Sequence, residues 1–318
     1  MKKLLTALAI ILLLTACNSN ETIEAPQADL EIEQGPVYAT FTLNAQEFMT
    51  PDLSLEVIES LVELHDDFNI PLDIFFADFL VQELDETSIF EELADNFMIA
   101  VSYHIRLPMP YTNWDGIKDW ESLSYDERYD KYLQYESFTI DPVSGELTNQ
   151  PGGYSYLKEL LGYAPYAVGI PVLDEALVDV YADLGAQFAV SHAKSSYGFN
   201  DSVQSLSYRP ETYEIKIYEY TRDELELKLN DILDRKTEEP VIINFKMHDK
   251  DFFADASAWT LMYVHHKVPY DYKDYHSNVT YLTEEEEEEI WELYQFALDY
   301  IDGHNEIWAV NLDDISLF

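Results

Sequence analysis

The sequence predicts an α/β fold in which a single β/α barrel follows an N-terminal signal segment and a tether. Runs of β-forming residues alternate with helical patterns about eight times, which is typical of a parallel sheet. About eight such units in one chain of 318 residues favour a closed barrel over an open sheet. The chain also lacks the glycine-rich fingerprints of dinucleotide-binding and phosphate-binding open sheets.

The first residues have the pattern of an export signal. Lys2 and Lys3 precede an apolar stretch, Leu4–Leu14, that is too short to span a membrane comfortably. The Leu-Thr-Ala-Cys that follows resembles a bacterial lipoprotein cleavage site, so we expect residues 1–16 to be removed and Cys17 to carry lipid. The alternative is an ordinary signal peptide with an incidental cysteine. Cys17 is the only cysteine, which excludes internal disulfides and a cysteine zinc site.

This signal implies a protein of the cell envelope that is held at the membrane by its lipid. In a double-membrane host, Asn18 after the cysteine resembles the signal for sorting to the outer membrane. Residues 17–35 are polar and acidic without periodicity, which predicts a flexible tether. We expect the barrel domain at 36–318, with an insertion at about 108–153, where a long stretch breaks the alternation.

The composition is strongly acidic. The chain has 62 Asp and Glu against 18 Lys and Arg, a formal net charge of −44. Such a surface repels phosphate backbones, so we expect no nucleic-acid partner. Cation binding is one use of so many carboxylates, and a solvated acidic face is the more frequent one. The 24 Tyr and 5 Trp could line a sugar site, although most such rings lie in cores.

In the first half of the chain, strand patterns and helix patterns alternate. Leu55, Ile58, Leu61 and Val62 have helical spacing, and Pro71 lies just beyond the end of that helix. On this helix we expect His65 at the surface. Strands are predicted at Val37–Leu43, Leu72–Ala77 and Phe97–Ile105, and helices at Ser54–Phe68 and Glu86–Asn96. The insertion is predicted to hold a helix at Asp126–Tyr135, a turn at Asp141–Gly145 and a loop at Asn149–Gly153.

The second half repeats the alternation. Gly185 follows a helical pattern of apolar residues, as expected at the C-terminus of a helix. Thr221 and Thr283 each precede a Glu by three residues, which predicts a capping box at the start of two later helices. Strands are predicted at Tyr166–Ile170, Gln187–His192, Tyr213–Glu219, Val241–His248 and Glu306–Asn311. Helices are predicted at Ser155–Leu161, Leu173–Leu184, Thr221–Asp234 and from Thr283 to about Ile301.

Polar side chains recur where the predicted strands end, and strand ends meet at one face of a β/α barrel. The residues expected at this rim are Asn44, Asp78, His104, Arg106, His192, Glu219, Lys246, His248, Asp249, Asn311 and Asp313. If the three histidines converge, they match a catalytic zinc site, which has three protein ligands and an open position. The alternative is that neighbouring groups at its own strand end satisfy each histidine.

Specific roles follow from spacing. Lys246 and His248 share one side of a strand, and Arg106 stands in the same relation to His104. The two cations could hold a carboxylate or an oxyanion, or form structural ion pairs. Asp249 and Asp251 could orient His248, act as a base or cap the next segment. We therefore expect catalytic roles for His248, Asp249 and Arg106, substrate contacts from Lys246, Tyr103 and Asn44, and a divalent metal, zinc, on His104 and His192. A glycosidase with paired carboxylates stays open.

Four segments together resemble the polysaccharide deacetylase superfamily. They are Thr40–Asn44, Ile70–Phe76, Val101–His104 and Asn244–Asp249, in that order along the chain. The resemblance implies a deformed β/α barrel shared with certain glycoside hydrolases, a metal-binding His-x-x-x-His that starts at His104, and an acid histidine at His248.

The chain departs from the family pattern at three positions. Thr42 and Leu43 stand where the Thr-Phe-Asp-Asp motif has aspartates, and Pro108 stands where the second metal histidine would be. These replacements remove the expected base and two metal ligands. The sequence thus predicts a cell-envelope lipoprotein that is a carbohydrate-active hydrolase, deacetylase-like or glycosidase-like, with a glycan ligand. The alternative is a non-catalytic barrel that binds a saccharide or an envelope partner.

Overall fold

The computed structural model describes residues 35–104, 120, 122–140, 147–170, 174–191, 204–205, 212–235, 238–256 and 279–315. These residues belong to one compact unit, residues 34–318. The predictions for Cys17, the tether, Arg106 and His192 lie outside the described residues. Within the described part of the chain, no helix is both long and apolar enough to cross a membrane.

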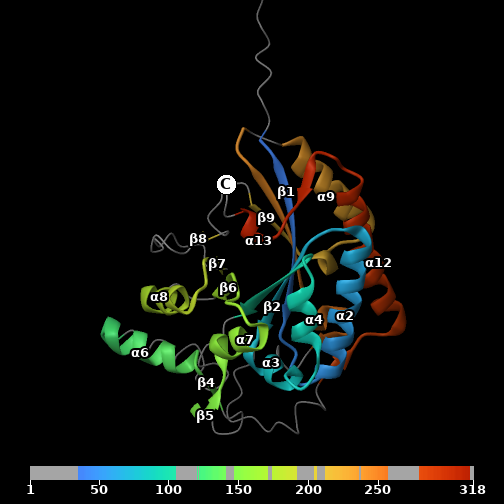
Figure 1. The fold of residues 1–318 in the computed structure, drawn as a ribbon. Coiled ribbons are helices and arrows are strands. Elements are labelled where there is room, and N and C mark those ends of the chain that lie inside the picture. Colours follow the sequence, from blue (N-terminus) through green and yellow to red (C-terminus); the bar gives the residue numbers. More distant parts are fainter. Residues whose placement is uncertain are drawn as a thin grey trace, which may run out of the picture. The chain divides into compact units, whose positions relative to one another are not determined.

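A curled parallel sheet forms the centre of this unit, which confirms the predicted α/β barrel class in a half-barrel form (Figure 1). Its order is β8-β7-β6-β3-β2-β1-β10-β9, and β13 pairs with the start of β1. Among the described strands no pairing joins β8 to β9, so a closed cylinder is not seen there. The strands are β1 Val37–Ala45, β2 Leu72–Ala77, β3 Ile99–His104, β6 Ala167–Ile170, β7 Phe188–Ser191, β8 Gln204–Ser205, β9 Thr212–Ile215, β10 Val241–His248 and β13 Ile307–Ala309.

Helices follow the strands, and α2 and α12 lie side by side on one face of the sheet (Figure 1). The helices are α2 Pro51–Phe68, α3 Asp78–Leu84, α4 Ile89–Asp95, α6 Tyr125–Tyr135, α7 Gly153–Leu161, α8 Glu175–Leu184, α9 Arg222–Asp234, α12 Glu284–Asp302 and α13 Leu312–Ile315. Both predicted capping boxes are present, at Thr221 with Glu224 and at Thr283 with Glu286. These caps explain why α9 and α12 begin where they do.

Two predicted segments differ from the structure. The loop expected at Asn149–Gly153 is largely strand β5 (Leu147–Pro151), which pairs with β4 (Phe138–Ile140) in a separate hairpin. The strand expected at Tyr213–Glu219 ends at Ile215, and a 3₁₀ turn, η2 (Ile217–Glu219), follows. Alternating residues continue into η2, so sequence alternation alone could not mark this end.

The two faces of the sheet are chemically different. In β1, Phe41 and its odd-numbered neighbours pack against the helices, and the Phe41 ring stacks on Phe245 of β10 at 4.6 Å. The even-numbered residues face the barrel interior, where the hydroxyls of Thr40 and Thr42 donate to Asn244 Oδ1. The barrel interior is therefore polar around Thr40, Thr42 and Asn244. These residues precede the C-terminal ends of β1 and β10.

His65 contradicts its prediction, because it is buried under α12 and not exposed on α2. One ring nitrogen, Nδ1, lies 2.8 Å from the Ile70 carbonyl, and Nε2 lies 2.7 Å from the Tyr294 hydroxyl. Burial lowers the pKa of His65 to about 4. A neutral imidazole with both nitrogens bonded is a structural element of the core, since neither nitrogen is left for chemistry.

Candidate active site

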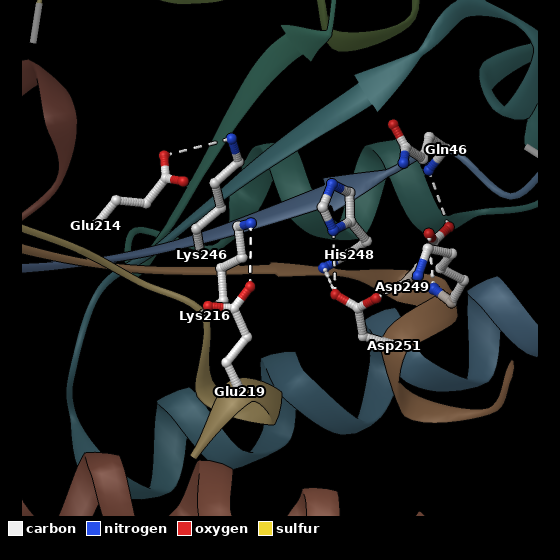
Figure 2. Close-up of polar contacts among 9 residues, drawn as sticks. Gln46, Glu214, Lys216, Glu219, Lys246, His248, Asp249 and Asp251 are labelled. Carbon is white, nitrogen blue, oxygen red and sulfur yellow. Dashed lines mark hydrogen bonds and ion pairs between the residues drawn. The ribbon is translucent and has the colours of Figure 1, made fainter. Parts of the chain in front are cut away.

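The end of β10 carries the polar side chains that the fold brings to the barrel interior. Strand alternation puts Asn244, Lys246 and His248 on that face, and the register sets Asn44 of β1 beside His248. Figure 2 shows the Lys246 amine and the His248 ring on the same side of β10. A 3₁₀ turn, η3 (Asp249–Phe252), follows the strand and supplies the acidic partners.

His248 is held by Asp251, three residues along the chain. Asp251 Oδ2 accepts from the His248 backbone N–H at 2.8 Å and lies 3.0 Å from Nδ1 (Figure 2). Burial raises the pKa of Asp251, but its bonds to His248 and Lys250 outweigh this, and the net pKa lies below its ordinary value. An ionised carboxylate only accepts, so Nδ1 carries a proton and Nε2 of the neutral ring is basic. Within the described part of the chain, no hydrogen bond occupies Nε2.

Lys246 is a buried cation beside this pair. Its residue is 5% exposed, and its Nζ lies 3.5 Å from Glu214 Oε2 on the neighbouring strand β9 (Figure 2). Burial lowers the pKa of Lys246 to about 8, although the charge of Asp251 acts in the opposite direction. The same burial raises the pKa of Glu214. The Lys246–Glu214 pair therefore places an ammonium and a carboxylate together on the interior face.

Asn44 completes the interior set that the sequence predicted. It is 4% exposed, and in the sheet it lies level with His248 on one side and with Phe75 on the other. Its amide can both donate and accept, which suits a group that orients a ligand. Asn44, Lys246 and His248 are thus brought together, as the sequence predicted for residues at one rim.

Asp249 lies directly after β10, but its contacts differ from those expected of a catalytic residue. Its side chain is 0% exposed, and its Oδ2 accepts from the backbone N–H groups of Gln46 and Glu47 and from the Ser54 hydroxyl. Burial raises its pKa, and these bonds oppose the rise. Asp249 therefore clamps the β1–α2 connection to η3, which corrects its assignment as a catalytic group. The cap expected for the next segment is made by His248 and Asp251 at the start of η3, and not by Asp249.

Tyr103 also differs from its prediction. Its side chain is 0% exposed and lies on the helix side of β3, where its ring contacts Tyr154 at 5.7 Å and Tyr181 at 6.1 Å. A substrate in the barrel interior cannot reach a ring on the opposite face of the sheet. Tyr103 is therefore a core residue on the helix side of the sheet, which differs from the substrate contact expected of it.

His104 lies on the interior face but far along the sheet from His248. Three strand-to-strand steps separate β3 from β10, which is about 14 Å measured along the sheet. Among the described residues, no three His, Cys, Asp or Glu side chains are placed to hold one metal ion. The described residues therefore do not fit the zinc centre that the resemblance implies.

Two features near His248 were not predicted. Glu214 lies on the short strand β9, level with Asn244 of β10. Because side chains alternate along a strand, this position could have been predicted to face the barrel interior. A cavity of about 250 Å³ lies beside Asp251, and this could not be read from the sequence. The lining residues are Tyr218, Lys250, Asp251, Ala254, Asp255, Leu282, Glu286, Glu289 and Ile290. Asp251 is the member of the proposed site that lines this cavity, whereas His248, Lys246 and Asn44 do not line it.

Comparisons with known proteins agree on the fold. No protein-family model matches the sequence, and no curated protein matches it. A probable polysaccharide deacetylase from Pseudomonas aeruginosa PAO1 is 11% identical with a TM-score of 0.53, over 88% of this chain and 90% of that one. PuuE allantoinase is 11% identical with a TM-score of 0.52, over 88% and 89%. A polysaccharide deacetylase candidate from Mycobacterium smegmatis is 10% identical with a TM-score of 0.51, over 90% of each chain.

These similarities show the fold of this chain, a β/α barrel of the deacetylase type. The predicted barrel is thereby confirmed, and identities of 10% and 11% leave the chemistry to the residues of the site.

Proposed function

We propose that the chain is a carbohydrate-active hydrolase of the deacetylase-like kind, which removes an acyl group from a glycan at the interior end of β10. The observation that carries this proposal is the His248–Asp251 pair, in which Nδ1 is held at 3.0 Å and no hydrogen bond from a described residue occupies Nε2. This is the arrangement that a general base requires, because the carboxylate fixes the tautomer and stabilises the protonated ring. The fold neighbours named as polysaccharide deacetylases support the substrate class.

In this mechanism His248 first acts as a base. Its Nε2 takes a proton from water, and the water oxygen bonds to the acyl carbon, so that the carbonyl oxygen becomes an oxyanion. The tetrahedral intermediate then collapses, the bond from the acyl carbon to the leaving oxygen or nitrogen breaks, and the imidazolium returns its proton to that leaving atom. Asp251 stays ionised throughout, since its pKa is already below its ordinary value.

The test is acyl release from acetylated glycans and from 4-nitrophenyl acetate by the purified protein. We expect His248→Ala to lower kcat/KM at least about 100-fold. His304→Ala is the matched control, because His304 bonds the Tyr300 carbonyl near the end of α12 and should leave the rate unchanged. Hydrolysis that persists in His248→Ala would contradict the assigned mechanism.

A second function has its own support, because Thr42 and Leu43 replace the motif aspartates and the described residues form no metal cluster. It is a barrel that binds a saccharide without cleaving it. An absence of hydrolysis in the wild-type protein, together with glycan binding that survives His248→Ala, would favour this function over the first.

We further propose that the protein is anchored to the cell envelope by lipid on Cys17. The Leu-Thr-Ala-Cys sequence supports this, since it resembles a lipoprotein cleavage site. Labelling with a fatty-acid analogue in a bacterial host should mark the wild-type protein and not Cys17→Ala. Equal labelling of both proteins would contradict the anchor.

A further inference from the structure

We infer that the Lys246 ammonium binds the oxyanion of the reacting acyl group and thus supplies the positive charge for catalysis at this site. This inference rests on the proposed function, because it assigns a partner to His248 in the same reaction. It goes further by identifying which group polarises the carbonyl where the described residues offer no metal cluster.

The position of Lys246 supports this role. Lys246 and His248 are two residues apart on one strand, so their side chains leave the same face about 7 Å apart along it. Directly across from Lys246 lies Thr42 of β1, whose hydroxyl donates to Asn244 at 2.8 Å. β1 therefore places a hydroxyl and not a carboxylate opposite the ammonium.

The charge balance around Lys246 also favours an anionic ligand. The residue is 5% exposed, whereas its partner Glu214 has a side chain that is 42% exposed and lies 3.5 Å away. This separation is longer than the distance of about 2.7–2.9 Å that is usual for charged hydrogen bonds. The pKa of Lys246, about 8, indicates that its present surroundings stabilise the ammonium less than water does. An oxyanion that forms nearby restores this stabilisation.

The reaction balances with these groups alone. Water adds to the acyl carbon, its proton passes to His248 Nε2, and the carbonyl oxygen becomes an oxyanion beside the Lys246 ammonium. The scissile bond then breaks, the proton moves from His248 to the leaving atom, and the acyl product is a carboxylic acid that releases its proton to the solvent and leaves as a carboxylate. Lys246 gains and loses no proton in this cycle. Because one ammonium polarises a carbonyl less strongly than a divalent metal, we expect acetyl esters to react faster than acetamides.

The competing role for Lys246 is a structural ion pair with Glu214. Lys216 provides the matched control, since it lies just beyond β9 and pairs with Glu219 at 3.2 Å (Figure 2). Lys246→Met keeps the length and apolar stem of the side chain and removes only the charge. The Glu214 side chain left without this partner is 42% exposed, so water can solvate its charge and the variant should remain folded.

The experiment measures acetate binding and ester hydrolysis on the purified full-length protein in the presence of a metal chelator. Acetate represents the carboxylate product, and 4-nitrophenyl acetate is the ester. We expect Lys246→Met to weaken acetate binding at least about tenfold and to lower kcat about 100-fold with KM little changed. Lys246→Arg should retain most acetate binding, and Lys216→Met should behave as wild type.

The outcomes separate this inference from the proposed function. Ester hydrolysis that depends on His248 but is unchanged in Lys246→Met overturns the inference and leaves the function standing. Acetate binding lost only in Lys246→Met, in a protein that hydrolyses nothing, supports Lys246 as the anion site and overturns the hydrolase. Equal acetate affinity in wild type, Lys246→Met and Lys216→Met overturns the inference whatever the activity.

Discussion

Asp249 and Asp251 are two residues apart, yet their surroundings give them opposite roles. Asp249 accepts hydrogen bonds from Gln46, Glu47 and Ser54, so its carboxylate has a structural role. Asp251 binds His248 and Lys250, so its charge acts on the site. The two carboxylates should therefore respond differently to the same substitution.

Asp251→Asn tests the role of Asp251 as the residue that positions His248. The amide can turn its N–H₂ toward Nδ1 and so favour the tautomer in which Nε2 carries the proton. We expect ester hydrolysis to fall about 10- to 100-fold, with KM nearly unchanged. Asp255→Asn is the control, because Asp255 lines the same cavity and is exposed. Equal rates in the two variants would show that Asp251 is only structural.

Asp73 leads to a prediction about stability and pH. It is 1% exposed on the interior face, and burial together with the charge of Asp313 raises its pKa well above the ordinary value. A carboxyl whose pKa is raised in the folded state favours folding at low pH and loses this contribution as the pH rises through that pKa. Asp73→Asn should therefore stabilise the protein at pH 7, because the amide oxygen can still accept from Leu312 N–H.

The measurement for Asp73 is urea unfolding of wild type and variant from pH 7 down to about pH 5. The stabilisation should shrink as the pH falls, since the wild-type carboxyl becomes protonated. Glu59→Gln makes the same change of charge on the exposed side of α2 and should show no such trend. A lower stability of Asp73→Asn at pH 7 would contradict the prediction.

At the scale of elements, a hydrogen bond from Gly153 to Asp78 is one of the contacts that join the inserted segment to the barrel. Asp78 at the end of β2 accepts from Gly153 N–H, at the start of α7, through Oδ1. Gly153 has φ +62°, and a Cβ there would lie 2.6 Å from the Glu136 Cα. Both the turn and the close approach therefore require glycine, and Asp78 is an anchor for the insertion at the rim where the sequence predicted a site residue.

Gly153→Ala should destabilise the protein by roughly 2 kcal/mol or more, because backbone strain and a steric overlap add together. Gly162→Ala is the matched control. Gly162 also has a positive φ, +74°, but a Cβ there meets nothing within 4 Å. We expect that variant to lose only about 1 kcal/mol in urea unfolding. Equal losses would show that the approach to Glu136 relaxes easily.

At the scale of the whole molecule, the formal net charge of −44 leads to a prediction about how salt affects stability. Repulsion among so many carboxylates opposes the compact state, and salt screens it over a Debye length of about 30 Å at 0.01 M and about 8 Å at 0.15 M. Raising NaCl between these concentrations should therefore raise the urea midpoint. Replacing the exposed Glu284, Glu285 and Glu288 of α12 by Gln should reduce this effect of salt. A midpoint that falls with salt would contradict this account.

Local signals in the sequence determined much of the architecture. The capping residues Thr221 and Thr283 precede the Glu residues they bind by only three positions, so the starts of α9 and α12 could be predicted. The His248–Asp251 pair is also local, three residues apart within one turn. Alternation along β10 correctly put Lys246 and His248 on one face.

Only the tertiary structure decided which face of each strand looks inward. Both faces of a parallel sheet carry apolar residues, so the sequence could not tell that Tyr103 lies among the helices while His104 looks into the barrel. Contacts between distant segments were equally out of reach. Asp249 binds Gln46 across 203 residues, and Lys246 meets Glu214 on another strand. Alternation along a strand predicts which side chains share a face of the sheet. Only the packing of helices against one face shows which set of side chains is directed into the barrel.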